Sequence, residues 1–178
     1  MKLVENYIKG YDEVLTDEEC KNFITKIDQE TLLQIIDETH AYRAKSVHGL
    51  PNWTEDDTLL SSIAFHLAQE YFNEVEVPLI PQIEGFEAVH VIKMQDKDYI
   101  DVHVDVNSQS SAKRYLTVMI FFNEFNGQIL FPTIEKSVRP KAGSVLIFPP
   151  TWMFPFAIEH TKGSTNHFAM TYLHYINK

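Results

Sequence analysis

Cysteine and basic residues are scarce in this sequence. Cys20 is the only cysteine among 178 residues, which excludes an intramolecular disulfide framework. Lysine and arginine total 15 against 25 aspartate and glutamate residues, so the formal net charge is −10. A chain with this balance lacks the basic footprint that nucleic acids require. We therefore expect no nucleic-acid partner, while a basic peptide remains compatible with the charge.

Long hydrophobic runs are also missing. No apolar segment approaches the roughly 18 residues that a membrane-spanning helix needs. The first ten residues, MKLVENYIKG, contain no apolar stretch of the secretory type. We therefore expect no membrane partner and a reducing, cytoplasmic setting. No repeat or low-complexity segment divides the chain, and its length suits one domain, so residues 1–178 are expected to form a single domain.

The first 80 residues or so are predicted to be mainly helical. Apolar spacing predicts helices over about 17–28 and 57–74. Residues 31–37 fit a strand as well as a continued helix. Residues 39–56 contain glycine and proline and are predicted to be a loop. Three of its residues are expected to be exposed or to pack locally: His40, His48 and Trp53.

The remainder, about 83–176, is rich in valine, isoleucine, phenylalanine and tyrosine. Short runs of these residues predict strands near 84–94, 98–106, 114–122, 127–131, 135–139, 144–149, 154–160 and 166–175. Helices followed by many strands favour an α+β fold that is mainly β. In such a fold the helices buttress one sheet of a β-sandwich or jelly roll.

The strand predicted near 98–106 carries the most informative pair of residues. His103 and Asp105 are two positions apart, so on a strand their side chains share one face. An imidazole and a carboxylate placed in this way can bind one divalent metal ion. A second histidine from a distant strand would complete the 2-His-1-carboxylate set that suits non-haem Fe(II). The alternative for an isolated pair is a charged strand face in contact with solvent.

Four segments in order resemble the Fe(II)- and 2-oxoglutarate-dependent dioxygenases, specifically their prolyl 4-hydroxylase-like branch. They are VLTDEEC at 14–20, His103-Val-Asp105, RYLTVMIFFN at 114–123 with GQILFP at 127–132, and VRPKAGSVLIFP at 138–149. The resemblance implies a double-stranded β-helix, or jelly roll, over about 83–176, buttressed by the N-terminal helices. If the chain is phage-encoded, as some members are, its cytoplasmic setting is that of the host.

The resemblance also implies an activity. Fe(II) and the cosubstrate 2-oxoglutarate, with ascorbate as a candidate additional cofactor, would hydroxylate a substrate C–H bond. A peptidyl proline in a peptide or protein is the substrate class that the family suggests. One alternative is a degenerate β-helix that binds a ligand and has lost 2-oxoglutarate turnover. Another is a metal-dependent enzyme that uses a different cosubstrate.

The third metal ligand depends on how the segment after Phe148-Pro149 is aligned with the family. An ungapped alignment places Phe156 at the ligand position, and a phenyl ring cannot bind iron. A loop two residues shorter places His160 there, and this is the alignment we favour. The resemblance therefore implies His103, Asp105 and His160 as the metal ligands.

The cosubstrate anchor also departs from the family pattern. The usual cation on the last strand is replaced by His167, or by Asn166 in the ungapped alignment. A protonated imidazole could pair with a carboxylate, although less well than arginine does. Phe121 stands where a carboxylate-binding tyrosine is common, and Arg114 is expected outside the pocket because of its parity. The cosubstrate-binding candidates are Tyr99, Tyr115, Thr117, His167 and Asn166.

Overall fold

The computed structural model describes residues 5–75 and 83–175. Within these ranges the helices are η1 (Glu5–Tyr7), α1 (Asp17–Gln29), η2 (Pro51–Trp53), α2 (Thr54–Glu74) and η3 (Pro132–Ile134), where η marks a short 3-10 helix. The strands are β1 (Lys9–Tyr11), β2 (Leu33–Ile36), β3 (His40–Ser46), β4 (Ile83–Phe86), β5 (His90–Gln95), β6 (Tyr99–His103), β7 (Arg114–Phe121), β8 (Gly127–Phe131), β9 (Lys136–Val138), β10 (Val145–Phe148), β11 (Phe156–His160) and β12 (Thr165–Tyr175).

Helix α1 begins where its sequence predicts. The Thr16 hydroxyl accepts a hydrogen bond from the Glu19 amide at 3.2 Å, and the Glu19 carboxylate accepts one from the Thr16 amide at 2.8 Å. This reciprocal capping box satisfies amide groups that the first turn of a helix leaves unpaired. The apolar residues Cys20, Phe23 and Ile27 then share the buried face of the helix.

The conformation of two N-terminal segments depends on the strands with which they pair. Residues 31–37, which fitted a strand or a helix, contain strand β2. The loop predicted over 39–56 is wrong for the segment that forms β3, which lies between β5 and β6. Its His40, Tyr42 and Ala44 alternate along the strand and line one cavity. Pairing with two strands decides the conformation here, because the local signal is weak.

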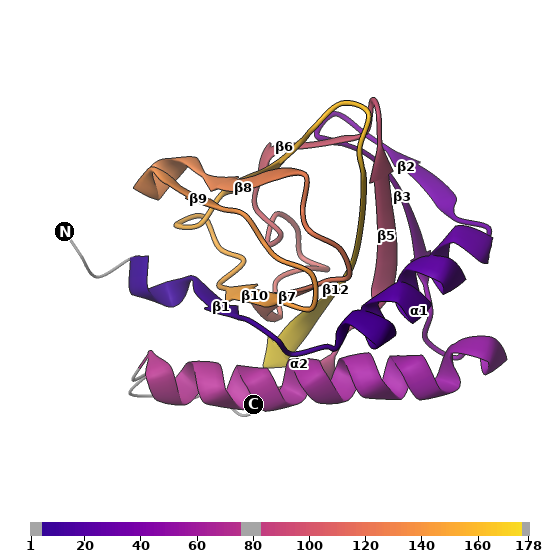
Figure 1. Cartoon of the computed structure of the whole chain (residues 1–178). Helices are drawn as coiled ribbons and strands as arrows, with labels where there is room; N and C mark the ends of the chain where they lie inside the picture. The colour runs from indigo at the N-terminus through magenta and orange to yellow at the C-terminus, as the bar shows by residue number, and fades with distance from the viewer. Residues whose placement is uncertain (1–4, 76–82, 176–178) are drawn as a thin grey trace.

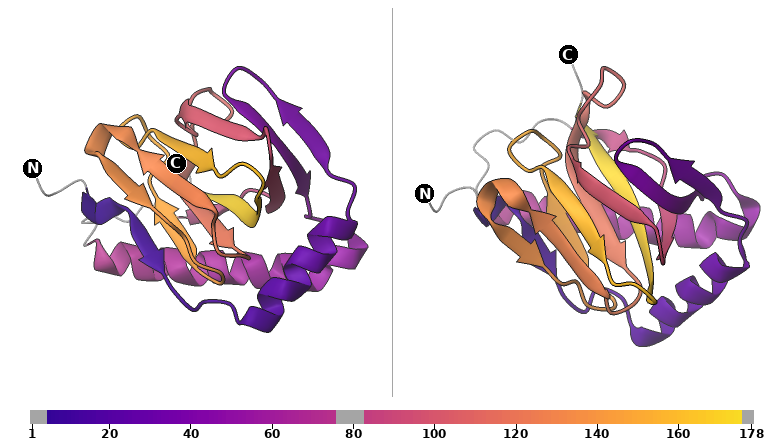
Figure 2. Two further views of the ribbon diagram at one scale, coloured as in Figure 1. Left: turned by 45° about the horizontal axis from the view of Figure 1, so that its top comes forward. Right: turned by 90° about the horizontal axis from the view of Figure 1, so that it is seen from above.

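All twelve described strands belong to one antiparallel sheet, with the order β1-β10-β7-β12-β5-β3-β6-β11-β8-β9; β2 pairs with β3, and β4 with β12. The sheet curls so that its two halves face each other (Figures 1 and 2). Phe148 of β10 accordingly packs on Phe131 of β8 and Phe156 of β11, with ring centroids 4.9 and 5.0 Å apart. The predicted jelly roll is confirmed.

Two hydrophobic cores stabilise this arrangement. The outer core lies between the helices and the outward face of the sheet, where Phe23 of α1 stacks on Phe122 at a centroid distance of 4.6 Å. Helix α2 runs along this face (Figure 1) and buries Leu60, Ala64, Leu67, Ala68, Tyr71 and Phe72. No helix in the described ranges has the length and apolar character needed to cross a membrane.

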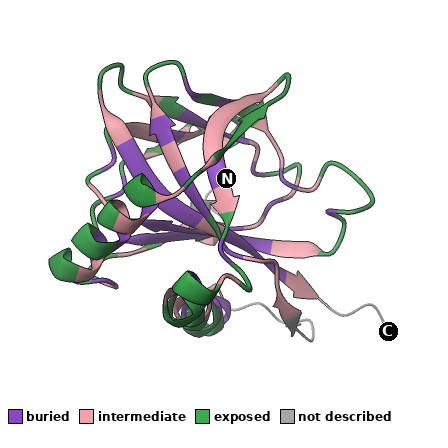
Figure 3. Cartoon of the chain, turned by 90° about the vertical axis from the view of Figure 1, so that its right-hand side faces the viewer, coloured by how far each residue is buried: buried purple, intermediate pink, exposed green. Residues whose placement is uncertain are grey.

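The inner core fills the space between the two halves of the sheet. Figure 3 shows buried segments along the strands that enclose it. Its largest members are seven phenylalanines: Phe121, Phe125, Phe131, Phe148, Phe154, Phe156 and Phe168. Burying one such side chain stabilises a fold by roughly 1.5–3 kcal/mol. The inside of the jelly roll is therefore a packed aromatic core.

Glu30, the residue that follows α1, links the end of this helix to β3 and to η2. Its carboxylate accepts hydrogen bonds from Trp53 Nε1 at 2.8 Å and Asn52 Nδ2 at 2.7 Å, and it pairs with the Lys45 ammonium of β3. The hydrogen bond from Lys45, followed by that from Trp53, lowers the pKa of Glu30 from 4.5 to about 2. The folded state therefore favours the ionised carboxylate.

We expect Glu30→Gln to lower the free energy of unfolding by about 1 kcal/mol at pH 7, because it removes a partly solvated charged contact. Since folding depresses this pKa, the stabilisation is complete above about pH 4.5 and is lost as the pH falls toward 2. Urea unfolding at several pH values measures the difference. Glu38→Gln, at an exposed position, serves as the control. Equal stability of Glu30→Gln and the parent at pH 7 would contradict the assignment.

Candidate functional site

One cavity opens between β3, β5, β6, β7 and β12, and we name it the His103 cavity. Its volume is about 280 Å³. Its polar lining includes His40, Tyr42, His103, Asp105, Arg114 and Tyr172. His103 and Asp105 therefore lie side by side, as expected, in a cavity that is large enough for a small ligand.

The His103 ring is oriented by its own strand. Its Nδ1 lies 2.9 Å from the backbone carbonyl of Asp101, which can only accept a hydrogen bond. This contact favours the tautomer with the proton on Nδ1, and it leaves Nε2 directed at Asp105 Oδ1, 3.3 Å away. Burial lowers the pKa of His103, but the hydrogen bond and the negative charge of Asp105 outweigh burial, so the pKa is raised overall.

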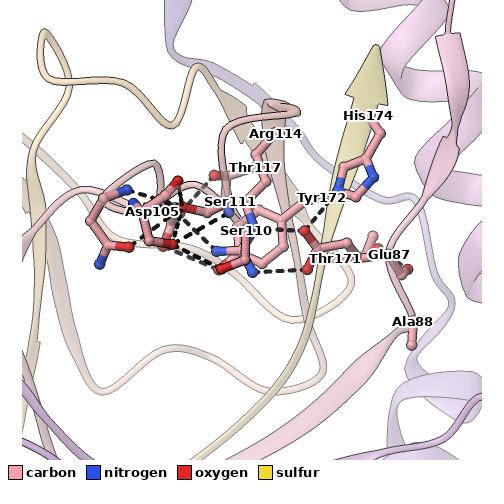
Figure 4. Close-up of polar contacts among 12 residues, drawn as sticks. Glu87, Ala88, Asp105, Ser110, Ser111, Arg114, Thr117, Thr171, Tyr172 and His174 are labelled. Atoms are coloured by element: carbon pink, nitrogen blue, oxygen red, sulfur yellow. Dashed lines mark hydrogen bonds and ion pairs between the residues drawn. The ribbon is translucent and has the colours of Figure 1, made fainter. Parts of the chain in front are cut away.

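The Asp105 carboxylate is buried and held by two hydroxyl groups. Thr117 Oγ1 donates to Oδ2 at 2.8 Å, and the Tyr172 hydroxyl donates to Oδ1 at 3.1 Å (Figure 4). Burial, followed by the charge of Asp105, raises the pKa of Tyr172 well above its ordinary value, so its hydroxyl remains a donor. The carboxylate is therefore fixed in position before any ligand arrives.

The Arg114 side chain lines this cavity, although strand alternation predicted that it would lie outside the pocket. Pairing between β7 and β12 passes from Leu116–Leu173 to Arg114–His174, so one extra residue, Tyr115, is accommodated on β7. Such a bulge reverses the faces of the residues beyond it. The Arg114 guanidinium lies 3.7 Å above the Tyr172 ring.

The donors of Arg114 are shared between a carboxylate and a backbone carbonyl. Its Nε and Nη2 donate to Glu87 at 2.6 and 2.8 Å, while Nη1 donates to the backbone carbonyl of Asp105 at 3.0 Å (Figure 4). Burial raises the pKa of Glu87, but hydrogen bonds from Arg114 and His174 lower it below the ordinary value. Arg114 therefore braces the backbone at Asp105.

The strand position opposite His103 is occupied by Phe156. These two residues are paired in the register of β6 and β11, and their ring centroids are 4.5 Å apart. His160 lies four residues farther along β11, opposite Gly127. Its Nδ1 is 3.0 Å from Asn166 Nδ2, and it does not line the His103 cavity. The structure therefore does not bring His160 to the His103–Asp105 pair.

The residues present fit the family's Fe(II) site only in part. His103 Nε2 and Asp105 Oδ1 lie 3.3 Å apart, whereas the strand position opposite His103 carries the phenyl ring of Phe156. In residues 5–75 and 83–175, no three histidine, cysteine, aspartate or glutamate side chains converge as a metal site.

The two candidates for the cosubstrate anchor lie on opposite faces of β12. Asn166 is fully buried, and its amide group bonds to the backbone of Asn126 at 2.9 and 3.1 Å. His167 faces α1, where its Nε2 lies 2.9 Å from Asp28 Oδ1. Burial lowers the pKa of His167 more than Asp28 raises it, and the ring faces Asp28 and does not line the His103 cavity.

The other three cosubstrate candidates are also engaged elsewhere. Thr117 is buried and donates to Asp105. Tyr115, displaced by the bulge, packs against Phe72 and Tyr175 at centroid distances of 5.8 and 6.1 Å. Tyr99 is 36% exposed and does not line the His103 cavity. A second register shift, between Ile100 and His103, separates the face of Tyr99 from that of His103.

His40 and Tyr172 are among the cavity residues that were not anticipated. His40 was assigned to a loop, although the alternation of His40, Tyr42 and Ala44 is a strand signal. Its ring centroid lies 4.4 Å from that of His103. Tyr172 alternates with Phe168 and Met170 along β12, and this spacing could have placed it on the inner face.

No protein-family model matches this sequence, and no curated protein matches it. Solved structures do match. A viral collagen prolyl hydroxylase from Paramecium Bursaria Chlorella virus-1, solved with 2-oxoglutarate, superposes with a TM-score of 0.73 at 19% identity, over 96% of this chain and 97% of that one. This chain has the fold of the 2-oxoglutarate/Fe(II) oxygenases. At this identity the likeness establishes the fold alone.

Two further oxygenase structures share the fold. A prolyl hydroxylase from Trichoplax adhaerens, in complex with a hypoxia-inducible factor peptide, has a TM-score of 0.78 at 16% identity, over 98% of this chain and 86% of that one. A 2OG-Fe(II) oxygenase family member from Burkholderia pseudomallei has a TM-score of 0.71 at 11% identity, over 99% and 89%. The resemblance seen in the sequence motifs is confirmed at the level of the fold.

We expect Thr117→Val to lower the free energy of unfolding by roughly 1.5–3 kcal/mol, because it removes a hydrogen bond to a buried charged group. Thr117→Ser, which keeps the hydroxyl, should lose only about 1 kcal/mol from the missing methyl group. Chemical denaturation of the three proteins at pH 7 measures both values. A valine variant as stable as the parent would show that Asp105 does not depend on this contact.

Proposed function

We propose that this chain is a ligand-binding module built on the oxygenase fold, and that it does not turn over 2-oxoglutarate. This is the degenerate alternative left open by the sequence. The observation that carries it is Phe156, which lies against His103 and stands where the ungapped alignment places the third iron ligand. A phenyl ring offers no lone pair to a metal ion.

The interior of the jelly roll supports the same proposal. Phe121, Phe125 and Phe168 pack together there, with ring centroids 5.6–6.2 Å apart. A dicarboxylate such as 2-oxoglutarate needs a cation or several donors when it is buried. The Asn166 amide is already bonded to Asn126 and His160, so it closes a loop and is not free to hold a carboxylate.

The His103 cavity is the place where such a module would bind its ligand. Its carboxylate and imidazole are oriented by Thr117, Tyr172 and the Asp101 carbonyl. Groups fixed in advance lose little freedom when a ligand arrives, which improves affinity. The cavity therefore provides preorganised hydrogen-bond acceptors beside a partly apolar wall.

We expect the purified chain, given Fe(II), 2-oxoglutarate, ascorbate and O2, to form no more succinate than a His103→Ala/Asp105→Ala double variant. Neither protein should show the weak visible charge-transfer band under anaerobic conditions with Fe(II) and 2-oxoglutarate. The physical reason is that Phe156 lies opposite His103, and that the donors of Arg114, the cation among the described cavity residues, are already bonded to Glu87 and to the Asp105 carbonyl. Succinate formation by the parent that the double variant loses would overturn the proposal.

A second candidate function is an oxygenase that hydroxylates a peptidyl proline. It is favoured by the oriented His103–Asp105 pair and by the likeness to prolyl hydroxylases, one solved with 2-oxoglutarate and another with a peptide. In that case these two side chains would hold Fe(II), which supplies the oxidising chemistry. Mass spectrometry of proline-containing peptides after incubation tests it: the gain of one oxygen atom supports this function, and unchanged peptides count against it.

A further inference from the structure

Strand β2 is an edge of the sheet and has no charged residue. In the part of the chain that the structure describes, it pairs on one side only, with β3, and it lies at the margin of the sheet (Figures 1 and 2). All four of its residues are exposed. The exposed fractions are 67% for Leu33, 36% for Ile35 and 71% for Ile36. The strand thus presents three large apolar side chains to water, which solvates them poorly.

The backbone of β2 also has polar groups that point away from β3. At the end of the β2–β3 ladder, the Asp37 amide donates to the His40 carbonyl at 2.9 Å. Hydrogen-bonded pairs alternate along an antiparallel ladder, so the residues two and four positions before Asp37 also direct their backbone groups at β3. The N–H and C=O groups of Gln34 and Ile36 therefore point outward. Such a row of groups is a template for another extended chain.

Two other edge strands have a feature that discourages this kind of pairing, and β2 does not. Edge strands of natural proteins commonly carry lysine, proline or a bulge. The strands at the two ends of the sheet, β1 and β9, begin with Lys9 and Lys136. Strand β2 has the sequence LQII, and its register with β3 is unbroken. An apolar edge without such protection is typical of a surface that another strand covers.

We propose that β2 pairs with β2 of a second copy of this chain, antiparallel and about a twofold axis. The outward groups are complementary to themselves, because Gln34 of one copy can lie opposite Ile36 of the other and exchange hydrogen bonds with it. Ile35 then lies opposite Ile35 on the axis, where side chains approach closely. In the same register Asp37 lies opposite Leu33, so the acidic residue next to β2 does not face its own copy. The proposal is independent of the ligand-binding function above.

Charge and area determine the strength of this dimer. Four residues on each side bury less surface than a permanent dimer does, so the association is reversible. Each chain has a formal net charge of −10, and the two copies repel each other at low ionic strength. Added salt screens this repulsion and should strengthen the dimer, whereas it would weaken the binding of a basic peptide to the same edge. Ile35 also lines the His103 cavity, so the second copy would lie next to this cavity.

Sedimentation velocity of the full chain from about 1 µM to about 1 mM tests the proposal. We expect a monomer–dimer equilibrium that salt shifts toward the dimer. Ile36→Lys should weaken dimerisation about tenfold, because the substitution enters the symmetric interface twice. Gln34→Pro removes an outward N–H while leaving the hydrogen bonds to β3 in place, and it should also weaken the dimer. Phe65→Lys, with the same change of charge on the exposed surface of α2, should leave dimerisation unchanged.

Amide hydrogen exchange shows which strand forms the interface. The Gln34 and Ile36 amides should be protected at high protein concentration and should exchange faster on dilution. A chain that stays monomeric across the range overturns the proposal, as does a dimer in which these two amides exchange freely. Parent affinity retained by both Ile36→Lys and Gln34→Pro overturns it as well. Circular dichroism shows whether each variant is folded, and the amide protection of the parent does not depend on the variants.

Discussion

The aromatic packing inside the jelly roll is the interaction on which the other features depend. Phe148 contacts Phe131 and Phe156 across the two halves of the sheet, and this contact holds the halves together. The same Phe156 ring lies against His103. One side chain therefore contributes to the core and also occupies the strand position that a metal ligand would need. The phenyl ring that packs in the core at this position has no lone pair to offer a metal ion.

Around that core, the polar groups of the His103 cavity form a connected network. The Asp105 carboxylate accepts hydrogen bonds from hydroxyl groups on β7 and β12. Its backbone carbonyl accepts a hydrogen bond from Arg114, which is itself paired with Glu87. A buried carboxylate is stable only when its hydrogen-bonding capacity is filled. The network therefore fixes Asp105 whether or not a ligand is bound, and it presents the carboxylate to a cavity bordered by two imidazoles.

Much of the fold could be predicted from the sequence, because the signals for its helices and strands are local. The capping box at Thr16, the apolar stripe of α2 and the strand runs after residue 83 each specify their own segment. The order of four motifs then identified the fold, and strand periodicity brought His103 and Asp105 together. The segment that forms β3 was missed because its conformation depends on pairing with β5 and β6.

The two long helices, the jelly roll and the His103–Asp105 pair could be predicted from the sequence, because each has a signal in the spacing or the order of residues along the chain. The identity of the other side chains beside the pair depends on contacts between distant segments and could be read only from the folded structure. Register shifts on β6 and β7 reverse the inward and outward faces, so Tyr99 and Tyr115 lie away from the cavity and Arg114 lies within it. The pairing of β6 with β3 and β11 places His40 on one side of His103 and Phe156 on the other. Strand periodicity cannot reveal a bulge or a neighbouring strand, since both are set by contacts between distant segments.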